Sequence, residues 1–210
     1  MTWYVTIPFK GAPLSKSRLA ERLNDTSRHA LAVAFLQDTV SAVRRTADVA
    51  SVLIVSNEPG LTALFAVEAE TGARVEIVPD PGDGLNAAIA QGILAARAAD
   101  PDASVAVLLG DLPELTADEL AEALGAAARH PLAYTADASG TGTTMIALAP
   151  GVTADPRFGV GSAAAHAAAG FSRLDVPASS GLRRDVDAPQ DLDALRAPGA
   201  HTRAVLALSR

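Results

Sequence analysis

The 210-residue chain contains no cysteine. Disulfides, thiolate metal ligands and a cysteine nucleophile are therefore excluded, and this composition is typical of a cytoplasmic protein. No apolar run approaches the roughly 20 residues that cross a bilayer. The first 13 residues also lack the basic start and long apolar core of a secretory signal. The sequence therefore predicts a cytoplasmic protein with no attachment to a membrane.

An excess of positive charge is also missing, since the formal net charge is -7 and the isoelectric point is near 5.0. This balance argues against non-specific binding to nucleic acids or to anionic membranes. A binding site for an anion must then be built locally, from a few Lys and Arg side chains, helix N-termini or a metal ion.

Strand patterns alternate with helix patterns along the chain, which predicts an α/β protein. Strands are expected over residues 3–9, 51–56, 74–78, 105–109, 132–136, 145–148 and 171–176. Helices are expected over residues 25–46, 61–71, 87–99, 116–129, 163–169, 190–196 and 203–208, with a short helix opening near residue 15. The length suits a single domain, residues 1–210, with a mostly parallel central sheet and helices on both faces.

The central strand of this prediction ends in a carboxylate, Asp111. The apolar run before it is typical of a buried parallel strand, Gly110 lets the backbone turn, and Pro113 prevents further pairing. Ligands of open α/β sheets bind outside the carboxyl ends of the strands. Asp111 is thus a candidate ligand for a metal ion, and the alternative is that it only caps the next turn.

Basic residues follow the first expected strand, at Lys10, Lys16 and Arg18, with Gly11 beside them. A strand, a glycine loop and a helix start form a possible phosphate cradle, because backbone N–H groups and the helix N-terminus face the anion. The P-loop consensus is absent. The alternative is a solvated basic turn.

Two further glycine turns precede helices. After Gly84, the Asn86 amide either caps the helix or reads the edge of a base, since an amide both donates and accepts. After Gly159, the helix start at Ser162 is a second candidate anion site, and the alternative is a plain serine cap.

Asp185 and Asp187 project to one face if their segment is extended. The alternative makes Asp187 the cap of the helix near residue 190, with Pro189 in its first turn. Glu114, by contrast, is interpreted as a solvated charge near a helix start.

Six short motifs occur in one order across nearly the whole chain. They are Lys10-Gly11 with Lys16-Ser17-Arg18-Leu19, Gly84-Leu85-Asn86, Gly110-Asp111-Leu112-Pro113, Gly140-Thr141-Gly142-Thr143, Arg157-Phe158-Gly159 with Ser162, and Leu182-Arg183-Arg184-Asp185-Val186-Asp187. This set resembles the guanylyltransferase family that makes the phosphodiester precursor of the deazaflavin coenzyme F-420. The family has a nucleotidyltransferase-type fold, Rossmann-like and similar to the nucleotide-diphospho-sugar transferases and to the enzymes that attach GMP to molybdopterin.

The resemblance implies a Mg²⁺-dependent transfer of GMP from GTP to phosphoenolpyruvate, with 2-phospho-L-lactate as the alternative acid. By the same resemblance, Asp111, Asp185 and Asp187 are catalytic and hold the metal. The acid is bound by Thr143, Gly159 and Ser162. The nucleotide is bound by Lys10, Gly11, Lys16, Arg18, Gly84 and Asn86. The basic loop departs from the glycine-rich loop of the wider superfamily.

The chemistry is consistent with the absence of an evident catalytic triad. A phosphomonoester carries close to two negative charges at neutral pH and is already a nucleophile. Other readings are nucleotidyl transfer to a different phosphate acceptor, or a nucleotide-binding module without catalysis. A homodimer is compatible with the sequence, which does not set the oligomeric state.

Overall fold

Seven strands form one sheet in the computed structural model, which describes residues 1–11, 17–66 and 72–208. The strands are β1 (Trp3–Pro8), β2 (Val49–Val55), β3 (Arg74–Val78), β4 (Ser104–Leu108), β5 (Leu132–Ala136), β6 (Thr143–Leu148) and β7 (Ser172–Arg173). Their spatial order is β3-β2-β1-β4-β6-β5-β7. Strand β1 therefore lies in the middle of the parallel half, between β2 and β4.

The sheet is mostly parallel, as predicted. Strands β1 to β4 pair in parallel, and β7 pairs in parallel with β5. Strand β6 runs against both β4 and β5. The carboxyl ends of β1 and β4 thus lie side by side at one edge of the sheet, where α/β proteins bind ligands.

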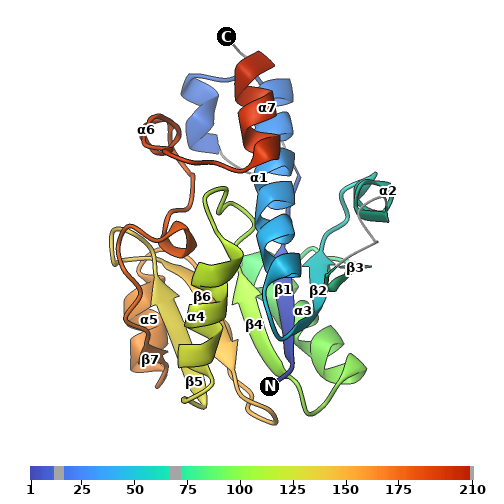
Figure 1. Cartoon of the computed structure of the whole chain (residues 1–210), viewed down its shortest axis with the longest axis vertical. Coiled ribbons are helices and arrows are strands. Elements are labelled where there is room, and N and C mark those ends of the chain that lie inside the picture. Colours follow the sequence, from blue (N-terminus) through green and yellow to red (C-terminus); the bar gives the residue numbers. More distant parts are fainter. Residues whose placement is uncertain (12–16, 67–71, 209–210) are drawn as a thin grey trace.

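Helices cover both faces of this sheet (Figure 1). The helices are η1 (Ser17–Glu21), α1 (Asp25–Arg45), α2 (Leu61–Ala66), α3 (Leu85–Ala99), α4 (Ala117–Ala127), α5 (Ser162–Ala168), η2 (Gly181–Arg183), α6 (Pro189–Asp193) and α7 (Ala200–Leu208). Apolar residues of α1, α2 and α4 pack on one face, and those of α3 and α5 pack on the other. Among the described residues, no helix is both long and apolar enough to cross a membrane.

Alternation of side chains within the strands explains the two cores. In β4, Ala106 and Leu108 belong to the core under α1, whereas Val105 and Val107 belong to the core under α3. All four are fully buried. A strand buried on both faces reads as a continuous apolar run, which is why the sequence predicted β4 well.

Local side-chain caps begin helices α1 and α4. The Asn24 side chain accepts from the Ser27 N–H at 2.8 Å at the start of α1. Thr116 and Glu119 form a capping box at the start of α4. These residues satisfy N–H groups that have no partner within the helix.

The last helix begins earlier than predicted. Helix α7 starts at Ala200, three residues before the expected start, and lies along α1 (Figure 1). The carboxylate of Asp38, in α1, accepts from the N–H groups of His201 and Thr202 at 3.0 and 2.9 Å. The cap comes from a residue more than 160 positions away, so a local pattern could not reveal it.

Two other expected elements are shorter than predicted. The strand over residues 171–176 is reduced to β7, although the Leu174 N–H still donates to the Tyr134 carbonyl at 2.9 Å. The helix over residues 190–196 ends at Asp193, and Arg196 and Ala197 direct their N–H groups to Glu114 instead. The end of the helix predicted over residues 61–71, and Lys16, lie outside the described residues.

Candidate active site

A cavity of about 290 Å³ opens at the carboxyl ends of β1 and β4. Its lining comes from the end of β1, from α1, from the loop at Asp80, from the start of α3 and from the end of β4. The charged residues among its lining are Lys10, Asp80, Asp111 and Asp187. Among the described residues, three carboxylates and one ammonium group give this lining a negative balance. Two residues of the predicted metal site, Asp111 and Asp187, therefore line one cavity together with a residue of the predicted basic loop.

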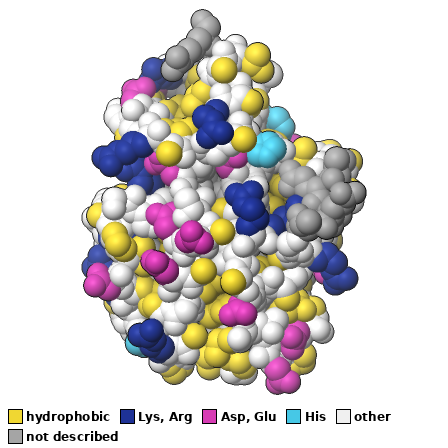
Figure 2. All heavy atoms as spheres, in the orientation of Figure 1, with side chains coloured by type: hydrophobic (Ala, Val, Ile, Leu, Met, Phe, Trp, Pro, Cys, Tyr) yellow, Lys and Arg dark blue, Asp and Glu magenta, His cyan; other side chains and the backbone are white. Residues whose placement is uncertain are grey.

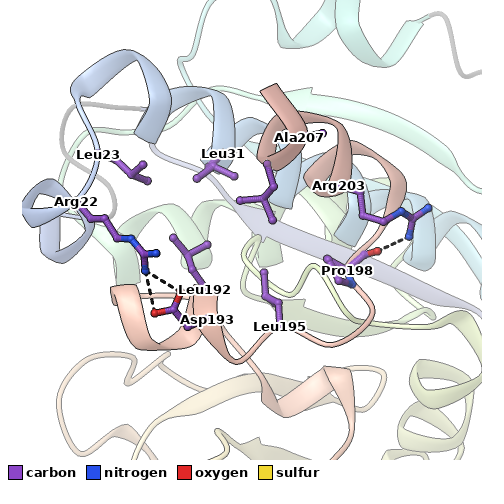
Figure 3. A pocket seen from close by; sticks show the side chains of 10 residues that line it. Arg22, Leu23, Leu31, Leu192, Asp193, Leu195, Pro198, Arg203 and Ala207 are labelled. Carbon is purple, nitrogen blue, oxygen red and sulfur yellow. Dashed lines mark hydrogen bonds and ion pairs between the residues drawn. The ribbon is translucent and has the colours of Figure 1, made fainter. Parts of the chain in front are cut away.

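A larger hollow of about 600 Å³ lies between η1, α1, α6 and α7 (Figure 3). Leucine side chains point into it, and its exposed Arg22 and Asp193 are already paired at 2.7 Å (Figure 3). None of the described residues that the sequence singled out for catalysis or binding lines it. Size alone is therefore a poor guide here, and the smaller cavity is the candidate active site.

Backbone hydrogen bonds fix the segment that carries Asp111. The Leu112 N–H donates to the Thr39 hydroxyl at 3.1 Å, and the Asp111 carbonyl accepts from the Val186 N–H at 3.2 Å. The second bond brings the segment of Asp187 next to the end of β4. This arrangement places carboxylates from distant parts of the sequence at one edge of the sheet.

Gly110 lies at a bend of the backbone, as predicted, and it also allows a close approach between elements. Its backbone is not among those with positive φ. A Cβ atom there would lie 3.1 Å from Leu36 Cδ1 and 3.2 Å from Ile7 Cγ2, which is tighter than almost all real Cβ contacts. Glycine at this position therefore allows β4 to end close against α1 and β1.

Asp185 lies in a different place from Asp187. Val186 between them is buried against Leu31 and Phe35, as expected for an alternating segment. However, Asp185 lines a separate hollow of about 170 Å³ that does not include Asp111 or Asp187. Among the described residues, no group of three or more His, Asp or Glu side chains is arranged to hold a metal ion.

The alternative role of Asp187 as a helix cap is wrong. Helix α6 has Ala188 at its N-cap and Pro189 in its first turn. The Asp191 carboxylate accepts from the N–H groups of Asp187 and Ala188 at 2.9 and 2.7 Å. The exposed Asp187 side chain is therefore not used to start the helix.

Glu114 is not the solvated charge that the sequence suggested. Its side chain is only 8% exposed, and Oε2 lies 2.7 Å from Arg184 Nε. Oε1 accepts from the N–H groups of Arg196 and Ala197 at 2.5 and 2.7 Å. Since Glu114 follows Asp111 and Arg184 precedes Asp185, this ion pair ties the two carboxylate-bearing segments together. Nothing in the local sequence indicated the pairing.

The predicted basic loop is only partly described. Lys10 is exposed and lines the cavity. Gly11 lies against the carboxylate of Glu58, which is 3.5 Å from the His29 imidazole. Arg18 is exposed in η1. The structure thus brings Lys10 to the cavity, whereas Gly11 contacts an acidic side chain.

The turn before α3 leaves the helix N-terminus without a side-chain cap. Gly84 is the N-cap, with φ of 97°, and Leu85 and Ala88 of the first turns line the cavity. The alternative role of Asn86 as the cap is therefore wrong. Its amide instead makes two hydrogen bonds to the backbone of Phe158, accepting at 2.9 Å and donating at 3.0 Å.

The three residues predicted to bind the acid converge around a histidine that the sequence did not single out. Thr143 begins β6, and Ser162 begins α5 and donates its N–H to the Gly159 carbonyl at 3.1 Å. His166 Nδ1 lies 3.0 Å from the Thr143 hydroxyl. Gly161 is the N-cap of α5, so the alternative of a serine cap at Ser162 is also wrong.

His166 is fully buried, and burial is the main cause that lowers the pKa of its imidazole to about 4. The positive charge of Arg157 lowers the pKa further, and a hydrogen bond to the Ser162 backbone acts in the opposite direction. The ring is therefore neutral at physiological pH. The only hint in the sequence is a histidine within an alanine-rich helix.

The mostly parallel α/β sheet has the fold of solved nucleotidyl transferases and of nucleotide-diphospho-sugar transferases. Solved structures agree with this fold class. A protein from Desulfovibrio desulfuricans, assigned to the nucleotide-diphospho-sugar transferases, superimposes with a TM-score of 0.73 at 16% identity, over 100% of this chain and 96% of that one. A Methanothermobacter nucleotidyl transferase gives a TM-score of 0.62 at 20% identity, over 99% of each chain.

The chain belongs to the guanylyl transferase CofC like family, whose model matches residues 3–206. It is 40% identical to the phosphoenolpyruvate guanylyltransferase of Streptomyces scabiei, over 100% of this chain and 97% of that protein. It is 45% identical to the phosphoenolpyruvate guanylyltransferase of Thermomonospora curvata, over 100% of this chain and 90% of that protein. The predicted family is therefore confirmed.

Proposed function

We propose that this chain transfers GMP from GTP to phosphoenolpyruvate, releasing pyrophosphate and forming enolpyruvoyl-2-diphospho-5'-guanosine for coenzyme F-420 biosynthesis. Full-length similarity to phosphoenolpyruvate guanylyltransferases supports the reaction. The observation that carries it in the structure is the meeting of Asp111, Asp187 and Lys10 in one cavity at the carboxyl ends of β1 and β4. A cytoplasmic location belongs to the proposal, since a chain without cysteine is typical of a reducing compartment.

The acid supplies its own nucleophile in this reaction. An oxygen of its phosphate attacks the α-phosphorus of GTP, a new P–O bond forms, and the bond to the β-phosphate oxygen breaks as pyrophosphate leaves. The phosphate is ionised at neutral pH, so no side chain has to remove a proton. The protein's main task is to hold two anions in line, at the short distance that the attack requires.

The residues present fit a divalent cation such as Mg²⁺. Asp111 and Asp187 supply hard oxygen donors in the cavity, and Mg²⁺ is usually held by one or two carboxylates plus substrate phosphates. The described residues do not supply a complete ligand set, so substrate oxygens would have to fill the remaining positions. When bound, the ion would neutralise charge on the triphosphate and its leaving group. Asp185 is kept in the proposal as a residue of the same segment.

The nucleotide side of the proposal uses the first turn of α3. Its N–H groups have no side-chain cap, and a helix N-terminus of this kind favours phosphate. Lys10 adds a positive charge at the same cavity. The acid side uses Thr143, Gly159 and Ser162. Phe158, which precedes Gly159, is joined to α3 through the Asn86 hydrogen bonds.

A substrate panel tests the proposal. The chain is incubated with GTP, ATP or CTP and with phosphoenolpyruvate or 2-phospho-L-lactate, with and without Mg²⁺, and the products are identified by mass spectrometry. We expect the guanylylated enolpyruvate product, only with GTP and Mg²⁺. A predominant lactate product would overturn the choice of acid, and no nucleotidyl product with any pair would overturn the reaction.

Asp111→Asn separates catalysis from folding. The substitution keeps the size of the side chain and leaves the backbone bond to Val186 in place. We expect turnover to be lost while the thermal unfolding midpoint changes little. Asp118→Asn, at an acidic residue of the first turn of α4, is the matched control and should retain turnover. Near-normal turnover of Asp111→Asn would refute its assignment.

A further inference from the structure

One buried titratable group lies beside the proposed acid-binding residues and has no role in the chemistry above. His166 is fully buried in α5 and is enclosed by aromatic rings. Its ring centroid is 5.2 Å from that of Phe158, 5.0 Å from that of Phe171 and 6.1 Å from that of Tyr134. Both ring nitrogens nevertheless have polar partners.

One of these partners determines where the ring carries its proton. The backbone N–H of Arg157 points at Nε2 over 3.1 Å. A backbone N–H can only donate, so Nε2 must accept and therefore has no proton. The neutral ring then carries its single proton on Nδ1. Protonation of both nitrogens would set two N–H groups against each other at Nε2, in keeping with the lowered pKa of this ring.

The direction of the bond to Thr143 follows from that tautomer. Nδ1 carries a proton and cannot accept, so the Thr143 hydroxyl oxygen accepts from Nδ1 over 3.0 Å and shares this proton with the Ser162 backbone. The hydroxyl proton of Thr143 is consequently not spent on the histidine and can be donated elsewhere. An anionic ligand needs donors, so this tautomer sets Thr143 in the state that favours phosphate or carboxylate.

The same ring also connects the parts of the proposed acid site. It joins the start of β6, at Thr143, to α5 and to the backbone of Arg157. The adjoining Phe158 is held by Asn86 from α3. Removing the imidazole would release both the hydroxyl and the segment that leads into Gly159.

We propose that His166 is a positioning residue for the phosphorylated acid: its Nδ1–H tautomer directs the Thr143 hydroxyl proton toward the acid and fixes the Arg157–Gly159 segment. The inference rests on the proposed function in one respect, namely that Thr143 contacts the acid. The tautomer itself does not depend on that function. His166 touches neither reacting group and takes no part in bond making.

The first test is spectroscopic and needs no substrate. Nitrogen-15 correlation spectra of the histidine rings at pH 7 report the tautomer, and His166→Phe identifies the signal of His166 by its loss. We expect a neutral ring protonated on Nδ1. A ring protonated on Nε2, or a cationic ring, overturns the inference whether or not the chain uses phosphoenolpyruvate.

The second test is kinetic, with Phe171→Leu as the matched control, because Phe171 packs on the same ring and makes no hydrogen bond to it. His166→Phe should raise KM for the phosphorylated acid about tenfold, the worth of roughly one hydrogen bond, and change KM for GTP less than about twofold. His166→Asn, which can still donate near the Nδ1 position, should recover part of the loss. Thermal unfolding establishes that each variant is folded. An equal rise in both KM values would overturn the inference.

The third test asks whether His166 acts through Thr143. If it does, the double variant with Thr143→Val and His166→Phe should have nearly the same KM for the acid as Thr143→Val alone. The effects of residues in one hydrogen-bond network are not additive. If the two substitutions instead raise KM for the acid by independent factors that multiply in the double variant, the positioning role is refuted. Should the wild-type protein turn over no acid, the proposed function fails by itself, and the spectroscopic test still decides the tautomer.

Discussion

Acid should weaken the folded state through His166. The pKa of this residue is lowered from 6.5 to about 4, mainly by burial. Because the unfolded chain binds a proton more readily, the group contributes stability above pH 6.5 and loses it as the pH falls toward 4. With these two pKa values, the contribution at pH 5 is about 2 kcal/mol smaller than at pH 7.5.

Urea unfolding of the wild-type protein and of His166→Phe, measured across this pH range, isolates the effect. The variant has no titrating group at this position, and the other carboxylates and histidines cancel in the difference between the two proteins. We expect the stability advantage of the wild type to shrink by about 2 kcal/mol between pH 7.5 and pH 5. Parallel curves for the two proteins would show that the ring titrates normally, and the conclusion that burial lowers its pKa would be refuted.

Three other substitutions test the packing around the site. Gly110→Ala should lower the free energy of unfolding by about 1–3 kcal/mol in urea, because the added methyl group overlaps its neighbours, and an unchanged midpoint would contradict this. Glu114→Gln should lower the free energy of unfolding by about 1–3 kcal/mol, because it weakens the charged hydrogen bonds of a buried carboxylate. Glu122→Gln, exposed on α4, should leave it almost unchanged. Equal losses in the two variants would contradict the role of the ion pair. Asn86→Ala should speed amide hydrogen exchange at Phe158, whose N–H donates to the Asn86 side chain, and unchanged protection would count against the link.

Residues that act through local chemistry could be predicted from the sequence. The strand before Gly110 is apolar on both faces, and Asn24 and Thr116 cap helices through groups within three positions. The carboxyl end of β4 could likewise be identified as a ligand edge, since Asp111 follows directly on a buried run. Each of these features depends on neighbours in sequence, so a single chain contains the information.

Residues that act across the fold could not be predicted in this way. Asp38 caps α7, and Glu114 binds Arg184, over separations of 163 and 70 positions. Glu114 is an acidic residue near a helix start, and only the tertiary structure shows that it is buried. His166 bonds locally to the Ser162 backbone, and its role emerges only from its bonds to Thr143, at the start of β6, and to Arg157. The sequence therefore identified the ends of the elements better than the contacts between them.

Hydrogen bonds connect the two halves of the proposed site, which bears on how the substrates are aligned. Asn86 follows Leu85, which lines the cavity, and both atoms of its amide bind the backbone of Phe158, next to Gly159. A shift of the acid-binding turn would therefore strain α3, where we place the nucleotide phosphates. Because in-line attack loses much of its rate when the reacting atoms are about 1 Å out of place, a rigid connection between the two halves serves the proposed reaction better than two independent loops would.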